Sequence, residues 1–361
     1  MSETGYPRLI CSLPKLRQNA QAVTDRCHRS GISVAAVVKG ANGRREIAET
    51  VASGGCDQLA SSRLSQLERL KDLGLPTMLI RVPMPSEIAR MVRCCDYSLE
   101  SDLSVIDRIE AECSRQNRVH SVVLMADLGD LREGWWDREE LIAAAMHTEG
   151  LPHVCLAGIG TNLGCYGAIV PTVEKMEALA ALADAVEQAI GRKLEIVSGG
   201  SSTSFPLVQH GLMPEKINHL RIGEMILVHY DFPHEWDLND MDFLSSSVFT
   251  LQAEVLECRV KPSIPQGKIF VDAFGRKPKY EDHGEQIRAL LGIGGLDMGT
   301  RLRIIPRDSG IRVIGCSSDH TIVESDRVLN PGEILEFDIS YSELLLLSAA
   351  ADVTVEFLES E

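Results

Sequence analysis

Between Leu9 and Leu227, short apolar runs alternate with longer stretches in which apolar residues recur every three or four positions. The short runs are typical of strands buried on both faces, and the longer stretches are typical of amphipathic helices that end near Gly or Pro. The apolar runs begin at Ser33, Cys56, Thr77, Asp96, Val119, Cys155, Leu194 and His219. Eight strand–helix units of this spacing predict a closed (β/α)8 TIM barrel.

An open, doubly wound sheet is the alternative architecture. It would carry a GxGxxG turn after its first strand, whereas that strand here runs into the sequence KGANG, which does not match. After about Asp240 the pattern changes to short β-rich runs with turn signals, such as VFTLQAEVLECRV, KIFVDAF and IRVIGCSSDHTIV. We therefore expect a barrel over residues 1–240 and a mainly β domain over residues 241–361. The polar and aromatic stretch from Tyr230 to Asp242 suits a linker.

Composition and charge narrow the class of protein. Of the 361 residues, 44% are hydrophobic and 24% are charged, as in soluble globular proteins. Lys and Arg number 36 against 52 Asp and Glu, a formal net charge of −16, which argues against nucleic acid and anionic membrane partners. The N-terminus lacks a signal pattern, and the ten cysteines are scattered rather than spaced as a disulfide framework. We expect a cytoplasmic protein with mostly reduced thiols.

Reactive side chains fall where barrel strands end, which is where barrels place their active sites. Lys39 ends the first strand, and burial there would lower its pKa and suit Schiff-base formation. The alternative is a solvated surface lysine. Arg132 follows the fifth strand and Arg221 lies in the eighth. Each is a candidate site residue, and each could instead belong to a structural ion pair.

The ends of the sixth, seventh and eighth strands are rich in glycine and hydroxyl groups. Asn162 in GIGTNLGCYG can donate and accept hydrogen bonds, and Ser201 and Ser202 in SGGSSTS precede an expected helix. The backbone N–H groups of Gly223 and Glu224 lie at the neighbouring strand end. Barrels often bind phosphate in the loops after strands seven and eight. A lysine, an arginine and a phosphate cradle on one rim describe a site for a phosphorylated aldehyde cofactor.

These motifs resemble the fold-type III pyridoxal-phosphate enzymes, the alanine racemase family, and within it the ornithine and alanine-ornithine racemase-like branch. The resemblance rests on AVVKG, GIGTNLGCYGAIVPT, SGGSSTS, VDAFG and GCSSDHTIV, which together span both expected domains. It implies a pyridoxal-phosphate-dependent racemase that interconverts the L- and D-enantiomers of an amino acid, with ornithine, lysine or alanine as substrate. It also implies a homodimer in which the β domain of one subunit closes the barrel mouth of the other.

Roles follow from the resemblance residue by residue. Lys39 would form the Schiff base with the cofactor and act as the base on one face of the substrate α-carbon. Arg221 would face the pyridine nitrogen and leave it unprotonated, since an arginine keeps its proton above about pH 12. Arg132 would bind the substrate carboxylate through its bidentate fork. Asn162 stands where alanine racemases carry a histidine beside the pyridine arginine.

The resemblance also implies a phosphate site. Ser202 would hold the phosphate together with the backbone of Gly223 and Glu224, and Tyr341 would contribute a further contact. Alanine racemases carry an aromatic residue after the lysine that touches the phosphate. Gly43 occupies that position here, so phosphate binding must differ.

A second departure concerns the second base. The family uses a tyrosine in its C-terminal domain, and the nearest match here places Gly295 at that position. Racemisation needs a proton donor and an acceptor on opposite faces, or one base that swings. The candidates for the missing base are Ser318, Asp319 and His320 in CSSDH, with Cys165 and Tyr166 as more distant choices. His320 could equally be a structural strand histidine.

Substrate choice and reaction type stay open at this point. Asp272, Asp297 or Asp319 could bind the terminal ammonium of a basic amino acid. A non-catalytic pyridoxal-phosphate carrier is one rival, although such carriers lack a second domain. A metal-assisted aldolase or dehydratase is another, but it would need a metal ligand where Ile322 stands. A decarboxylase would need a cysteine proton donor, for which Cys316 is an imperfect candidate. No metal is expected.

Overall fold

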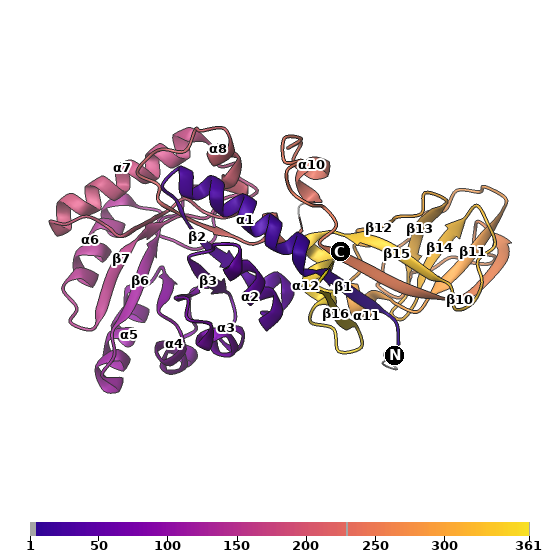
Figure 1. Cartoon of the computed structure of the whole chain (residues 1–361), viewed down its shortest axis with the longest axis horizontal. Helices are drawn as coiled ribbons and strands as arrows, with labels where there is room; N and C mark the ends of the chain where they lie inside the picture. Colours follow the sequence, from indigo (N-terminus) through magenta and orange to yellow (C-terminus); the bar gives the residue numbers. More distant parts are fainter. Residues whose placement is uncertain (1–4, 229, 361) are drawn as a thin grey trace. The chain divides into compact units, whose positions relative to one another are not determined.

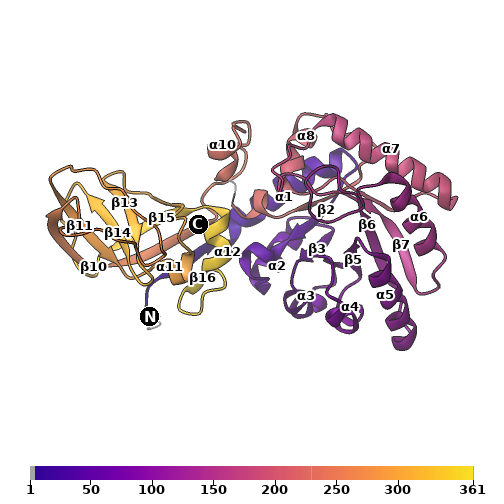
Figure 2. The same cartoon turned by 180° about the vertical axis from the view of Figure 1, so that it is seen from behind.

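The computed structural model describes residues 5–228 and 230–360. The chain folds into two compact units (Figures 1 and 2). One unit comprises Leu16–Ile226, and the other combines Met1–Lys15 with Leu227–Glu361. Among the described residues, no helix has the length and apolar character needed to cross a bilayer.

The unit Leu16–Ile226 is a closed barrel of eight parallel strands, which confirms the predicted (β/α)8 fold. The strands are β2 (Ser33–Val37), β3 (Gln58–Ser61), β4 (Thr77–Leu79), β5 (Tyr97–Glu100), β6 (His120–Met125), β7 (Val154–Gly160), β8 (Ile196–Ser198) and β9 (His219–Ile222). Pairing of β9 with β2 closes the ring. Because all eight strands are parallel, their carboxyl ends share one rim.

Helices surround the barrel (Figure 1). They are α1 (Leu13–Arg29), α2 (Arg45–Ser53), α3 (Leu64–Leu70), α4 (Ile88–Cys94), α5 (Leu103–Gln116), α6 (Arg138–Glu149), α7 (Val173–Ile190), α8 (Phe205–Gln209) and α9 (Glu224–Leu227). The carboxylates of Asp102 and Asp137 accept backbone N–H groups at the starts of α5 and α6, which explains where these helices begin. Alternate strand residues, such as Leu99 and Val123, fill the barrel interior. The others pack outward against the helices.

The second unit is an eight-stranded, mainly antiparallel sheet. Its strands are β1 (Arg8–Ser12), β10 (Phe249–Pro262), β11 (Glu285–Leu291), β12 (Ile304–Pro306), β13 (Ile311–Cys316), β14 (Thr321–Ser325), β15 (Ile334–Ile339) and β16 (Thr354–Leu358). They run in the order β12-β15-β10-β11-β14-β13, with β1 paired to β10 and β16. Three short helices accompany the sheet: α10 (Asp231–Glu235), α11 (Gly295–Met298) and α12 (Tyr341–Leu347).

Three local features differ from the sequence-based expectation. Strand β1, from the N-terminal segment, belongs to the antiparallel sheet rather than to the barrel. The run KIFVDAF, Lys268–Phe274, forms no strand, and Phe270 is exposed. The segment expected as a linker contains α10. All ten cysteines are free thiols, and seven of them are buried, as expected for reduced core residues.

Candidate active site

Lys39 lies on the carboxyl rim of the barrel, in the 3₁₀ turn Val38–Ala41 that follows β2. Burial lowers the pKa of its ammonium, electrostatic interactions with the side chains of Cys165 and Glu133 oppose this shift, and the positive charge of Arg132 adds to it. Within the described parts of the chain, the ammonium has no hydrogen-bond or ion-pair partner. A partly buried amine of this kind reaches its neutral, nucleophilic form more readily than an exposed lysine.

The turn after Lys39 cannot carry an aromatic side chain. Gly43 has φ +58°, and a Cβ built on it would lie 2.6 Å from the Cβ of Gln66. Gln66 is itself fixed, because its Oε1 accepts a hydrogen bond from Ser61 Oγ at 2.6 Å and its Nε2 donates to Asn42 Oδ1 at 3.1 Å. This hydrogen-bonded glutamine fills the space beside the glycine.

Arg132, in the loop after β6, lies beside a carboxylate and a thiol. Its Nη2 donates to Glu133 Oε1 at 2.6 Å, its Nε donates to Glu133 Oε2, and its Nη1 donates to Cys165 Sγ at 3.0 Å. Burial alone would lower the pKa of the guanidinium, but the bonds to Glu133 outweigh it and the pKa is raised. The buried carboxylate of Asp130 accepts the backbone N–H groups of Cys165 and Tyr166 at 3.3 and 3.1 Å. The loops after β6 and β7 are therefore tied together.

Arg221 points its guanidinium into a buried polar cluster at the ends of β7, β8 and β9. Its Nη1 donates to Ser198 Oγ and its Nη2 donates to Thr161 O at 2.8 Å. Burial lowers the pKa of Arg221 to about 10, so the group is still cationic at neutral pH. His219, whose Nδ1 lies 2.8 Å from Ser198 Oγ, has a pKa lowered to about 3 by burial and by the charge of Arg221, so it is neutral.

Two backbone amides converge on the hydroxyl of Ser202. Ser202 Oγ accepts the N–H groups of Gly223 and Met225, each at 3.3 Å. A Cβ at position 223 would lie 2.8 Å from Val37 O, so only glycine fits. Because Ser202 Oγ accepts these two N–H groups, its own O–H is left to donate to an anion between the ends of β8 and β9. We call Ser202 and these two amides the cradle.

Two further candidates border this cradle. The buried Nδ2 of Asn162 has no hydrogen-bond partner among the described residues. A buried donor left unpaired costs free energy, so it suits a group that binds there. Ser201 Oγ lies 3.0 Å from Thr203 Oγ1, which in turn donates to Leu163 O at 2.9 Å. Glu224 begins the short helix α9.

In the second unit, the predicted residues Ser318 and Asp319 lie in the turn between β13 and β14. Ser318 Oγ donates to Asp319 Oδ2 at 2.5 Å. The turn lies against Gly295, whose N–H donates to Ser317 O at 2.9 Å. A Cβ on Gly295 would meet the ring of Phe274 at 2.8 Å. A side chain at the position where the family resemblance places a tyrosine would have to displace the ring of Phe274, and the Ser318–Asp319 turn lies directly beside it.

His320 and Tyr341 occupy separate places in this unit. The N–H of His320 donates to Ser317 Oγ at 3.1 Å, while its ring makes no hydrogen bond within residues 5–228 and 230–360. Tyr341 begins α12, and its N–H donates to Asp231 Oδ2 at 3.1 Å. The histidine ring thus stays available for proton exchange.

The structure discriminates among the three candidate aspartates. Asp272 Oδ2 is paired with Arg276 Nε at 2.7 Å, and its Oδ1 accepts two backbone N–H groups. Asp297 Oδ2 accepts the N–H of Gly294 at 3.2 Å. Asp319 is exposed and bonds mainly within its own turn. Asp319 is therefore the most exposed of the three, while its carboxylate accepts one hydrogen bond, as that of Asp297 does.

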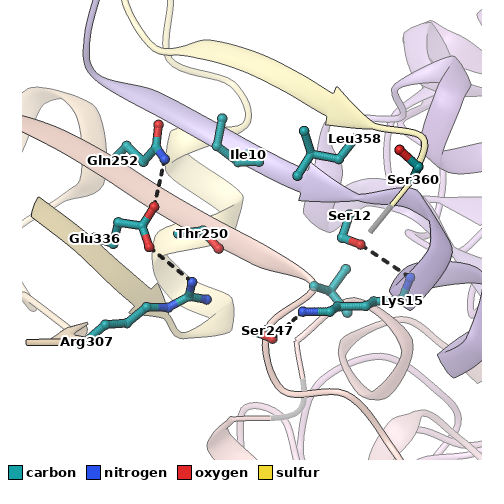
Figure 3. Close-up of a pocket in the computed structure, with 11 residues that line it drawn as sticks. Ile10, Ser12, Lys15, Ser247, Thr250, Gln252, Arg307, Glu336, Leu358 and Ser360 are labelled. Carbon is teal, nitrogen blue, oxygen red and sulfur yellow. Dashed lines mark hydrogen bonds and ion pairs between the residues drawn. The ribbon is translucent and has the colours of Figure 1, made fainter. Parts of the chain in front are cut away.

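The β unit also has a pocket of about 450 Å³, apart from the candidate site residues (Figure 3). Lys15 Nζ donates there to Ser247 Oγ at 3.0 Å, and Glu336 accepts from Gln252 at 2.8 Å and pairs with Arg307 at 3.5 Å. Glu336 and Arg307 thus pair with each other, whereas Lys15 is bonded to a neutral hydroxyl. It brings together no reactive group comparable to Lys39.

The barrel candidates Lys39, Arg132, Asn162, Ser201, Ser202, Arg221, Gly223 and Glu224 all lie at the ends of β2 and β6–β9. Sequence reasoning missed residues that support them, namely Asp130, Glu133, Thr161 and Met225, and it placed Ser198 in the serine-rich motif without its bond to Arg221. Glu133 could have been found as the acid that directly follows Arg132 in LREG. The others act through contacts between loops that no local pattern reveals.

Comparison with known proteins gives consistent matches. The family model for the alanine racemase N-terminal domain matches residues 11–231. The chain is 37% identical over 359 residues to an ornithine racemase of Acetoanaerobium sticklandii, with 99% of each chain covered. It is 37% identical over 344 residues to a lysine racemase of Thermotoga maritima, covering 94% of this chain and 95% of the relative. A solved alanine racemase of Clostridium difficile shares the fold with TM-score 0.77 at 17% identity, covering 99% of this chain and 97% of that one.

Proposed function

Because the chain belongs to the alanine racemase family, we propose that it is a pyridoxal-phosphate-dependent racemase of a basic amino acid, ornithine or lysine. Similarity to the ornithine and lysine racemases along almost the whole chain supports the substrate class. The observation that carries the proposal is the barrel rim itself. It combines a partly buried lysine, a buried arginine and the cradle at Ser202.

The residues of this rim fit pyridoxal phosphate. Lys39 supplies an amine without an ion-pair partner in the described chain, and the Ser202–Gly223 cradle supplies donors for the phosphate. Arg221 uses only part of its five-donor guanidinium on Ser198 and Thr161, so it has donors left for the pyridine nitrogen. The orphaned Nδ2 of Asn162 offers one more. We also assign Ser201, Glu224 and Tyr341 to the cofactor site, as the family pattern suggests.

Each barrel residue then has a distinct task. The bound cofactor supplies an electron sink that acidifies the substrate α-proton. Lys39 Nζ accepts or returns that proton on one face of the α-carbon, and burial keeps its neutral form accessible. Arg132 binds the substrate carboxylate through the Nη N–H groups that its bonds to Glu133 and Cys165 leave unused. Arg221 would hold the pyridine nitrogen as a hydrogen-bond donor only, because its guanidinium keeps its proton at neutral pH. Such a donor would leave the ring a weaker electron sink and disfavour side reactions.

The opposite face needs a second proton-transfer group. We assign it to the turn containing Ser318, Asp319 and His320, because this turn lies beside the blocked position Gly295. Among these three, the ring of His320 fits the task best, since it carries two nitrogens that can donate or accept a proton and makes no hydrogen bond in the described chain. His320→Ala is expected to abolish racemisation while leaving one-faced α-proton exchange in D2O. A His320→Ala variant that still racemises the substrate would refute the assignment of His320 as the second proton-transfer group.

A homodimer is part of this proposal. The family resemblance and the exposed apolar side chains Phe270 and Leu296 on the β unit support a protein–protein contact. If the partner subunit supplies the second base, mixing inactive Lys39→Ala and His320→Ala subunits restores up to about a quarter of wild-type activity, because half the dimers are mixed and each has one intact site. Absence of any restored activity, despite subunit exchange, would argue for sites built within one subunit.

The whole proposal is tested with purified protein, pyridoxal phosphate and single enantiomers of ornithine, lysine and alanine in D2O. Proton NMR follows α-proton exchange, and polarimetry follows inversion. We expect exchange with loss of optical rotation for ornithine or lysine. Exchange without inversion would indicate another reaction class, and inertness toward all substrates would favour a non-catalytic carrier.

A further inference from the structure

The carboxylate of Glu133 lies in the loop after β6, on the carboxyl rim of the barrel. Its side chain is only 12% exposed, and it forms two hydrogen bonds with the Arg132 guanidinium. Its charge also raises the pKa of Lys39, Arg132 and Arg221, in each case against the lowering effect of burial. Glu133 thus contacts Arg132 directly and acts on Lys39 and Arg221 through its charge.

Glu133 keeps unused capacity to accept hydrogen bonds. An ionised carboxylate has about four acceptor positions on its two oxygens. Arg132 Nε and Nη2 fill two of them, and no other donor among the described residues reaches the group. A nearly buried carboxylate gains from a further donor, above all a cationic one. The site therefore favours a ligand that brings an ammonium group to Glu133.

We propose that Glu133 is the residue that selects the charge of the substrate side chain. It accepts a hydrogen bond from the terminal ammonium of a diamino acid and repels a side chain that ends in a carboxylate. The inference rests on the proposed racemase function and deepens it, because it names the group that distinguishes basic amino acids from neutral ones of the same length. Glu133 lies in the barrel, whereas the aspartates considered above lie in the β unit.

The test compares wild type with Glu133→Gln, which keeps an oxygen that can accept from Arg132 but removes the charge. Glu87→Gln is the matched control, because Glu87 pairs with Arg81 at 2.5 Å after β4, on the same rim, and is similarly shielded. The substrates are L-ornithine, L-norvaline, which lacks the terminal ammonium, and L-glutamate. We expect the ratio of kcat/KM for ornithine over norvaline to fall at least about tenfold in Glu133→Gln. In Glu87→Gln this ratio is expected to stay within about twofold of wild type.

Equilibrium binding separates this inference from the racemase proposal. Calorimetric titration of the cofactor-loaded proteins with ornithine and norvaline measures the preference even if no amino acid is racemised, an outcome that would refute only the proposed reaction. An ornithine preference that is unchanged in Glu133→Gln would overturn the assignment. Glu133→Asp keeps the charge and guards against misfolding. If Glu133→Asp retains more of the ornithine preference than Glu133→Gln does, selection by the charge of Glu133 is supported. If both variants lose the preference equally, Glu133 only shapes the loop and the proposal is overturned.

Discussion

Glu100, at the end of β5, is buried on the outer side of the barrel wall and offers a sharp test of the fold. Its neighbour Leu99 packs inside the barrel, so Glu100 faces the helix layer. Ser98 Oγ donates to Glu100 Oε1 at 2.5 Å, while the buried Oε2 has no partner in the described chain. Burial raises the pKa of this carboxyl from 4.5 to about 8. The group is therefore mostly neutral in the folded protein at pH 7.

The sign of the pH dependence follows from linkage. A carboxyl whose pKa is raised by folding favours the native state most below its unfolded pKa, and this benefit is lost as pH rises through the folded pKa. For Glu100 the loss runs from about pH 4.5 to about pH 8. At about 1.4 kcal/mol per pH unit, it amounts to about 3 kcal/mol by pH 7.

Glu100→Gln removes this ionisation while keeping the size of the side chain. We expect the variant and wild type to be similarly stable near pH 4.5 and the variant to be more stable by about 3 kcal/mol at pH 7. Nearby His120, whose pKa burial lowers to about 4, titrates in both proteins and largely cancels in the comparison. Urea unfolding from pH 4.5 to pH 8.5, followed by circular dichroism, measures the difference. The exposed Glu177→Gln on α7 is the control.

A difference in unfolding free energy between Glu100→Gln and wild type that stays constant across this pH range would refute the reasoning. It would mean that the carboxylate is ionised in the folded state, and hence that water or a cation reaches the layer between β5 and its helices. If the unfolding free energy of Glu100→Gln relative to wild type fell between pH 4.5 and pH 7, the pH dependence would have the opposite sign. That result would also refute the reasoning.

Three further predictions concern the barrel rim. Lys39→Ala is expected to remove the near-visible absorbance of lysine-bound pyridoxal phosphate, and retention of that band would refute the assignment of the cofactor lysine. Gly223→Ala is expected to cost about 1–3 kcal/mol, because its methyl group would press on the backbone of β2, and to weaken phosphate binding. Unfolding curves measure the loss of stability, and a cofactor titration measures phosphate binding. If neither changed, the assignment of the phosphate site to Ser202 and Gly223 would be contradicted. Asp130→Asn is expected to speed amide hydrogen exchange at Cys165 at least about tenfold, since the N–H loses a charged acceptor. Unchanged exchange would show that the carboxylate does not hold this loop.

The barrel could be predicted from the sequence because each of its strands is covered on both faces. Such strands read as apolar runs whatever their partners, and the helix between two runs fixes their parallel order. Strand β1 escaped prediction because its partners, β10 and β16, lie more than 200 residues away in the chain. The run Lys268–Phe274 has the residues of a strand but no pairing partner, so its propensity alone does not make one.

The candidate site, like the fold, could be predicted only in part from the sequence. Lys39 and Arg221 could be placed because strand ends converge on one rim, which is a property of the fold rather than of the residues themselves. Neither the obstruction of position 295 by Phe274 nor the pairing of Arg132 with Cys165 has a local signature. Both depend on loops that meet only after folding. Sequence reasoning therefore finds the groups that act and misses those that position them.

Charge explains how this site can work within an acidic chain. The protein carries a formal net charge of −16, yet the barrel mouth holds Lys39, Arg132 and Arg221 against the carboxylate of Glu133. Such a local cationic excess suits a phosphate monoester, which carries about −1.5 to −2 at neutral pH. A substrate with a second ammonium would add positive charge to an already cationic mouth. If pyridoxal phosphate is held there as proposed, its negative charge would offset this repulsion, and Glu133 would be left to attract the side-chain ammonium. On this proposal the cofactor would have to bind before a basic substrate does.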